Sequence, residues 1–331
     1  PHMSRLISDK YREYQQTCQN RFDTLKANEE ELNRIFIDIY GLQEELTPDV
    51  ADKDVTVYRI IDEPSDEERK MRYVLSMRDE IVSLLSYIVG CILGRYSPYV
   101  EGLLFAGGEW DDAQIRARIE EGAKGCDFAD PSLGLFYPDG DGIVPITDEA
   151  YFSDDIAERT VEFIRKVYGE ETLEENLAFV ASALGGKGET PREVIRNYYL
   201  NDFYADHLKT YQKRPIYWLC DSGKAGAFRA LFYLHRYDRD TVGRIRMDYV
   251  HELQDRLRVQ LDDARRAQES GEGRAKMQAG KRVQKLEKQL IELGQYEEQA
   301  HHLADMRIPL DLDDGVKVNY AKLGAILGKI K

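Results

Sequence analysis

The sequence predicts a mainly α fold, in which long antiparallel helices carry a small β-containing insertion as the minor α+β part. Apolar residues recur at intervals of three and four over residues 4–45 and again over residues 240–308, the spacing that gives a helix one apolar face. Residues 216–220 instead read IYWLC and alternate in the manner of a strand. These observations predict two long helical arms that brace each other beside a smaller core.

The N-terminal helical arm and its linker are expected at residues 4–72. The apolar spacing over 4–45 fits one long helix or two consecutive ones, and Thr47-Pro48 ends the pattern because the residue before a proline disfavours helical backbone. Residues 52–72 are charged and contain Pro64, which predicts an exposed connection. Pro1-His2-Met3 resembles an expression-vector remnant, so Met3 is expected to be either an introduced start or a cut point inside a longer parent.

A helical core is expected at residues 73–215. The apolar run at 77–96 predicts a buried helix, whereas the glycines and prolines of 102–147 predict an irregular loop. Three short helices should follow. The first is capped by Thr147 or Asp148, the second ends at the glycines of 185–186, and the third starts at Thr190-Pro191.

A basic, β-hairpin-containing insertion is expected at residues 209–246. IYWLC and the aromatic-rich AFRALFYLH flank the turn residues DSGKAG, which is a hairpin pattern, although a helix starting within 225–235 is the competing interpretation. The C-terminal helical arm should span 240–308, pause at SGEG, and pack antiparallel on the N-terminal helix. Residues 309–331 should form a strand, a turn at Asp314-Gly315 and a final helix.

The overall charge limits the kinds of partner. The chain carries 61 acidic and 46 basic side chains, a formal charge of −15, which argues against a surface built for non-specific binding of nucleic acid or anionic membrane. Its four cysteines are scattered without zinc-ligand spacing, so we expect free thiols in a reducing compartment and no metal site. The longest apolar run is too short to cross a bilayer. A cytoplasmic protein with no membrane partner is expected.

Catalytic motifs are missing, and we expect no catalytic residue in this chain. GGKG at 185–188 lacks the order of a phosphate-binding loop and fits a helix C-cap. The pair His301-His302 and the DLDDG stretch at 311–315 lack the companions of a zinc or calcium site. EWDD at 109–112 offers paired carboxylates beside a tryptophan. An acid–base pair or a partner-binding hook would use such a stretch, but an ordinary charged loop explains it better.

Basic side chains gather between residues 209 and 246, against the charge of the rest of the chain. Nine basic residues face three acidic ones there, a net charge of +6. Their mixture with aromatic side chains suits phosphate contacts together with stacking on bases. The alternative is that the aromatics are core and the basic groups pair with acidic surfaces of the same chain. The candidate DNA-binding residues are Lys209, Lys213, Arg214, Lys224, Arg229, Arg236, Arg239, Arg244 and Arg246.

Different roles are expected within this set. Strand ends and turns carry Arg214, Lys224 and Arg239, which should be exposed and contact phosphates. Arg229 and Arg236 lie among aromatics that would hold a guanidinium flat, which favours base or minor-groove contact. Apolar neighbours such as Trp218 and Phe232 should form the core of the hairpin. A contiguous positive groove would favour DNA recognition, whereas scattered basic charges would favour a protein-interaction scaffold.

Several stretches resemble one protein family over nearly the whole chain. They are KRPIYWLCDSGK with the following ALFYLHRYDRDTVGRIR, NEEELNRIFIDIYGLQEELTP, GRYSPYVEGLLFAGGEWD, TPREVIRNYYLNDFYADHLKTYQ and LDLDDGVKVNYAKL. Together they resemble the C-terminal, target-recognising region of PglX, the adenine-specific DNA methyltransferases of BREX phage-defence systems.

The resemblance implies a methyltransferase domain that lies upstream of this chain. Neither FAGG at 105–108 nor DPSL at 130–133 follows the cofactor motif or the adenine-holding motif of such enzymes, so none of the family's catalytic residues is carried over. S-adenosylmethionine is expected in the missing domain and no cofactor in this chain. We therefore expect a non-catalytic fragment that contributes recognition of double-stranded DNA for methylation and phage defence, with the methyltransferase domain as its partner in cis. The alternative is a protein-interaction scaffold that docks other BREX proteins through acidic helices.

Overall fold

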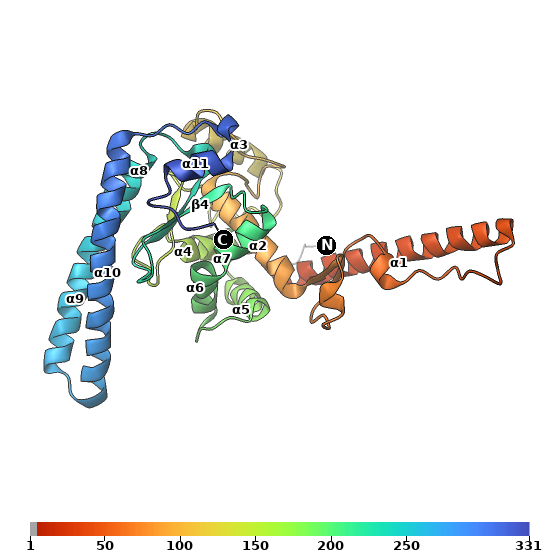
Figure 1. The fold of residues 1–331 in the computed structure, drawn as a ribbon, viewed down its shortest axis with the longest axis horizontal. Coiled ribbons are helices and arrows are strands. Elements are labelled where there is room, and N and C mark those ends of the chain that lie inside the picture. The colour runs from red at the N-terminus through yellow and green to blue at the C-terminus, as the bar shows by residue number, and fades with distance from the viewer. Residues whose placement is uncertain (1–4, 331) are drawn as a thin grey trace.

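A computed structural model describes residues 5–330, so the stretch Pro1-His2-Met3 and the first residue of the expected N-terminal arm lie outside the described residues. Helices dominate, and a three-stranded sheet lies in the central body, which confirms the mainly α prediction. Two long arms extend from opposite sides of this body (Figure 1): the red helix α1 on one side and the blue helical hairpin α9–α10 on the other. The predicted bracing of the N-terminal helix against the C-terminal arm is therefore wrong.

The N-terminal arm is one continuous helix, α1 (Ile7–Tyr40), which ends at Gly41 in the left-handed conformation. Its first half packs on the body: the Ile7 amide donates to Asn176 Oδ1 at 2.7 Å, and Tyr11 and Phe22 are buried. The chain then runs back along the helix, where Lys26 pairs with Asp52 at 2.8 Å. The expected exposed connection contains two short parallel strands, β1 (Arg59–Ile61) and β2 (Val74–Ser76).

The helical core forms largely as predicted, but the last of the three expected short helices is divided into two at Asp202. Helix α2 (Met77–Leu93) begins at a Ser76 capping box, ends at Gly94 and is deeply buried. Helices α4 (Ile156–Tyr168), α5 (Leu173–Leu184), α6 (Pro191–Asn201) and α7 (Phe203–Thr210) follow it. Thr190 caps α6 and Gly185 ends α5 as expected. The predicted cap of α4 at Thr147 or Asp148 is wrong: the helix starts at Ile156, and Asp155 caps it by accepting the amides of Ala157 and Glu158.

The stretch 102–147, expected to be irregular, contains two regular elements. Asp111 caps helix α3 (Asp112–Ala123) by accepting the amide of Gln114 at 3.1 Å. Strand β3 (Ile143–Pro145) is only three residues long and pairs antiparallel with β5 (Arg229–Tyr233). Both elements are short, and the strand depends on a partner far away in the sequence.

The predicted hairpin is confirmed. Strand β4 (Tyr217–Asp221) pairs antiparallel with β5 (Arg229–Tyr233), so the alternative helix within 225–235 is wrong. The sheet order is β3-β5-β4, with β5 in the centre. The outer edge of β4 is covered, because the amide of Asp221 donates to Ile326 O at 3.1 Å and that of Gly328 to Leu219 O at 2.8 Å.

The C-terminal arm is a helical hairpin. Helix α8 (Thr241–Arg244) continues through a π-helical turn (Ile245–Val250) into α9 (His251–Ser270), and α10 (Gly273–Met306) returns antiparallel to it after the predicted SGEG break. Apolar residues of the two helices meet along the hairpin and are buried there, namely Leu253, Leu257, Leu261, Val283, Leu286 and Leu293. This arm therefore packs on itself, which is why it does not need α1.

The last segment is simpler than expected. A 3₁₀ turn at Leu312–Asp314 precedes helix α11 (Val316–Lys322), and no strand lies among the described residues after 308. None of the helices within residues 5–330 has the length and apolar character needed to span a membrane.

Candidate nucleic-acid interface

The aromatic residues of the basic segment are mostly core. Trp218 is 0% exposed and Phe232 is 1% exposed, which confirms their expected place in the hairpin core. Trp218 packs its ring against Phe232 and Tyr320, and its indole N–H donates to Pro215 O at 3.0 Å. These rings hold the sheet to α11 and are not available to stack on bases.

The two arginines expected to contact bases are bound to this chain's own backbone. Arg229 donates to Leu200 O at 2.6 Å and lies 3.4 Å from Asp221. Arg236 donates to the carbonyl oxygens of Leu93, Asp139 and Gly140 at 3.2, 2.8 and 2.8 Å. These contacts occupy donors that a base would otherwise use, most completely in Arg236, and the expected base contacts of both residues stay predictions.

Arg236 also lies against the face of an aromatic ring. Its guanidinium carbon is 3.6 Å from the centre of the Trp110 ring, and burial lowers the pKa of Arg236 to about 10. Trp110 therefore serves as a platform for this arginine, and the neighbouring Asp111 is a helix cap. The EWDD stretch at 109–112 thus has a structural use, in agreement with the ordinary-loop interpretation.

Two further arginines of the set pair with carboxylates. Arg244 lies 2.9 Å from Asp238, and Arg246 lies 2.5 Å from Glu297 on α10. They fit the alternative in which basic groups pair with acidic groups of the same chain. Four of the nine candidates are thus bound within the protein.

The other five basic residues are exposed and have no partner among the described residues: Lys209, Lys213, Arg214, Lys224 and Arg239. They do not form one group along the hairpin. Tyr217 pairs with Tyr233 and Asp221 with Arg229, so Lys224 lies in the turn at the far end from Arg214. That turn is fastened to α10, where Glu292 accepts from the Ser222 hydroxyl at 2.7 Å and from the Ala225 amide at 2.6 Å.

Lys209 lies in the last turn of α7, and Lys213 and Arg214 lie on the short connection from α7 to β4; we call these three residues the basic corner. The helix ends here without a glycine: Gln212 and Lys213 adopt left-handed backbone with φ of 51° and 60°. The Lys213 amide donates to Leu208 O at 2.7 Å, which closes the end of α7. Left-handed backbone is unfavourable for most residues other than glycine and asparagine. The backbone of the basic corner therefore has a defined and somewhat strained shape.

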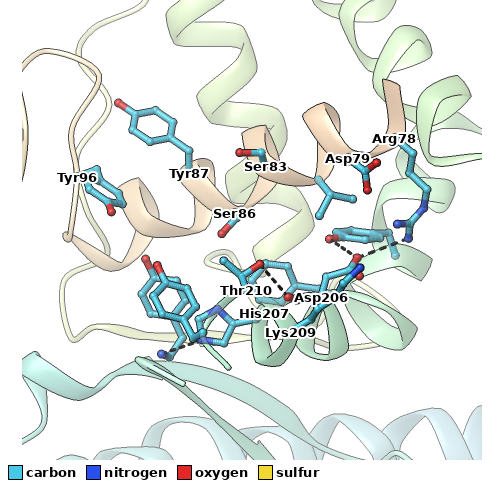
Figure 2. Close-up of a pocket in the computed structure, with 15 residues that line it drawn as sticks. Arg78, Asp79, Ser83, Ser86, Tyr87, Tyr96, Asp206, His207, Lys209 and Thr210 are labelled. Carbon is cyan, nitrogen blue, oxygen red and sulfur yellow. Dashed lines mark hydrogen bonds and ion pairs between the residues drawn. The ribbon is translucent and has the colours of Figure 1, made fainter. Parts of the chain in front are cut away.

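A pocket of about 540 Å³ opens beside the basic corner. It lies between α2, the α6–α7 pair and the start of β4, and Lys209 is part of its lining. We call it the tyrosine pocket, because Tyr87, Tyr96, Tyr198, Tyr211 and Tyr217 all line it. In Figure 2, Ser86 points from α2 toward Thr210 and His207 on α7.

The sequence reasoning missed this pocket, although a signal was present. Phe203, His207 and Tyr211 recur every fourth residue, which places three ring systems on one face of a helix. The structure also explains Gly90, since a Cβ there would lie 2.5 Å from the Tyr96 ring and 2.9 Å from the Tyr217 hydroxyl. A small residue at this point of α2 is what allows both tyrosines to approach the helix.

The motifs set aside in the sequence have ordinary structural roles. Gly185 ends α5, and Asp130 Oδ1 accepts from the Ser132 amide at 2.8 Å in a turn. His301 lies 3.3 Å from Asp305 one helical turn away. Within residues 5–330, no group of three or more histidine, cysteine or acidic side chains is arranged to hold a metal ion.

Comparison with known proteins links the chain to adenine methyltransferases. It is 42% identical over 328 residues to the adenine-specific methyltransferase PglX of Lacticaseibacillus casei (strain Zhang), a match that covers 98% of this chain and 24% of the relative. It is 38% identical over 321 residues to the adenine-specific methyltransferase BrxX of Escherichia coli O9:H4 (strain HS), covering 94% of this chain and 25% of the relative. No family model matches the chain.

These matches confirm the resemblance to PglX that the sequence motifs indicated. The chain spans about a quarter of the length of the curated relatives it matches. It is thus similar, almost from end to end, to one segment of a much longer methyltransferase.

Proposed function

We propose that this chain is a non-catalytic, C-terminal segment of a BREX adenine-specific DNA methyltransferase and helps it to recognise double-stranded DNA. The methyltransferase domain, with its S-adenosylmethionine, would lie elsewhere in the parent and act as the partner in cis. The similarity to PglX and BrxX supports the parent enzyme. The absence of both methyltransferase motifs from the sequence supports a non-catalytic role.

The basic corner is the observation that carries the DNA-recognition proposal. The chain has a net charge of −15, and three arginines of the segment 209–246 form ion pairs with its acidic groups: Arg229, Arg244 and Arg246. Lys209, Lys213 and Arg214 are instead exposed at the end of α7 and on the connection that follows it, without partners among the described residues. Unpaired cations on a backbone of fixed shape suit contacts with the phosphates of a duplex, which position a protein on DNA. Lys224 and Arg239 would add phosphate contacts only where the DNA path reaches them.

A second candidate function, docking of other defence proteins, is favoured by a different surface. The outer half of α1 exposes Leu32, Ile35, Phe36, Ile39 and Tyr40 on one face, and the last two are 68% and 70% exposed. A contiguous apolar face of this kind marks a protein contact in many proteins. Acidic residues flank it, which would favour a partner with a basic rim.

Charge reversal at the basic corner should separate the two functions. We expect Lys209→Glu, Lys213→Glu and Arg214→Glu together, in the full-length methyltransferase, to reduce methylation of target sites at least about tenfold at physiological salt, because three phosphate contacts become repulsive. Methylation is measured by protection of target adenines on plasmid DNA at limiting enzyme.

A matched control is available on α10. Arg274→Glu, Lys276→Glu and Lys281→Glu change the net charge by the same amount at exposed positions without partners among the described residues. Methylation by this control should stay within about twofold of wild type. Equal losses in both variants would mean that net charge alone matters, and unchanged methylation in the corner variant would favour the docking function.

A further inference from the structure

The tyrosine pocket contains a buried hydrogen-bond donor that no group in the described part of the chain satisfies. His207 is 3% exposed, and its Nε2 accepts the backbone N–H of Tyr217 at 3.3 Å. Its Nδ1 is buried and has no hydrogen-bond partner. Burial lowers the pKa of His207 to about 3, so the ring is neutral at physiological pH.

The hydrogen bond from Tyr217 fixes the tautomer of this ring. A neutral imidazole has one N–H and one acceptor nitrogen. Because Nε2 acts as the acceptor, the proton lies on Nδ1, and His207 presents an N–H donor without an acceptor. Buried donors in folded proteins are nearly always paired, so an unpaired one beside a pocket is satisfied by a group that enters the pocket, either an ordered water or a ligand atom that takes its place.

The walls of the pocket suit a flat ligand. The Arg95 guanidinium carbon lies 5.1 Å from the centre of the Tyr96 ring and 5.7 Å from that of Tyr211, and Arg95 also donates to the Tyr211 hydroxyl at 3.1 Å. The hydroxyl groups of Tyr96 and Tyr217 have no hydrogen-bond partner among the described residues. Ring faces combined with adaptable hydroxyl groups are typical of sites that hold unstacked bases.

Of the two basic residues that line the pocket, Arg78 forms an ion pair and Lys209 forms none within residues 5–330. Arg78 pairs with Asp206 at 3.5 Å, and Asp79 accepts from the Ser76 amide and hydroxyl at 2.8 and 2.7 Å. Lys209 is exposed without a partner among the described residues, and the rest of the basic corner follows it in the chain. A phosphate attached to the ligand would meet this lysine.

We propose that the tyrosine pocket binds a nucleobase, which packs against the tyrosine rings, accepts the Nδ1–H of His207 and places its phosphate at Lys209. The base comes either from a DNA strand held at the basic corner or from a free nucleotide. In its DNA form the inference rests on the proposed function, and it adds to that function a site for one base drawn out of the stack.

Photochemical crosslinking tests this site directly. The full-length protein is irradiated with a duplex that carries one unpaired iodouracil, and in a second arm with iodouridine monophosphate alone. Crosslinked peptides are then mapped by mass spectrometry. We expect crosslinks at Tyr96 or Tyr211 with the duplex if the pocket takes its base from DNA, and with iodouridine monophosphate if it binds a free nucleotide. Ser86→Trp should abolish them by filling the pocket, whereas Ser86→Ala should retain them, because Ser86 has no hydrogen-bond partner to lose.

The outcomes separate this inference from the proposed function. Crosslinks at the pocket tyrosines from duplex DNA support both. Pocket crosslinks from the free nucleotide, in a protein that does not bind duplex DNA, support the base site and contradict DNA recognition. Duplex binding without pocket crosslinks, or pocket crosslinks that survive in Ser86→Trp, overturns the base site and leaves DNA recognition standing.

Discussion

Replacing Trp218 by alanine is expected to reduce the free energy of unfolding by about 3–5 kcal/mol, the loss typical of a large aromatic side chain removed from a packed core. The ring is fully buried between Phe232 and Tyr320, so its removal leaves a cavity where the sheet meets α11. The carbonyl oxygen of Pro215 also loses its donor. Denaturant unfolding followed by circular dichroism measures the change.

Tyr40→Ala provides the matched control for this substitution. Tyr40 lies at the exposed end of α1, so its truncation should change the stability by less than about 0.5 kcal/mol. A Trp218→Ala protein that loses less than about 1 kcal/mol would contradict the structural role assigned to the hairpin aromatics.

Arg236→Ala is expected to cost about 2–4 kcal/mol, because hydrogen bonds from a charged group and a desolvated cation–π contact are lost together. Three carbonyl oxygens, from Leu93, Asp139 and Gly140, lose their donor. Arg236→Lys should recover little of this loss, since an ammonium group cannot reproduce the flat, forked geometry over Trp110.

Arg239→Ala is the control for Arg236, because Arg239 is exposed and has no partner among the described residues. Its stability should remain within about 0.5 kcal/mol of wild type. If Arg236→Ala were as stable as wild type but bound DNA more weakly, Arg236 would return to the set of DNA contacts.

Local patterns in the sequence were sufficient to predict the hairpin and most helices. Alternation in IYWLC, the turn residues after it and the burial of Trp218 and Phe232 all agree, because hairpins form between neighbours in the chain. Caps at Thr190 and Gly185 were equally readable. Strand β3 was not, since three residues carry almost no pattern and its partner β5 lies almost ninety residues away in the sequence, with Ile143 opposite Phe232.

Predicting which element an apolar helix face packs against is harder than recognising that face in the sequence. The seams of both arms were recognised correctly, but α9 packs on α10, which a short connection places beside it. The outer half of α1 consequently keeps Phe36 and Ile39 exposed.

The basic residues likewise could be identified from the sequence, but their contacts could not. A charge count finds all nine cations but does not reveal that Arg236 reaches carbonyl oxygens near residues 93 and 140. Three-dimensional contacts divided that set into cations bound within the protein and cations left free.

The salt dependence of DNA affinity tests the central claim most directly. Fluorescence anisotropy measures binding of the full-length protein to a labelled duplex over a range of salt, for wild type and for Lys209→Gln, Lys213→Gln and Arg214→Gln combined. We predict that the combined variant binds more weakly at every salt concentration and that its log–log salt slope is smaller by about three units, roughly one for each phosphate contact removed. The α10 control, Arg274→Gln, Lys276→Gln and Lys281→Gln, should keep the wild-type slope. An unchanged slope in the corner variant would contradict the assignment of the basic corner to DNA.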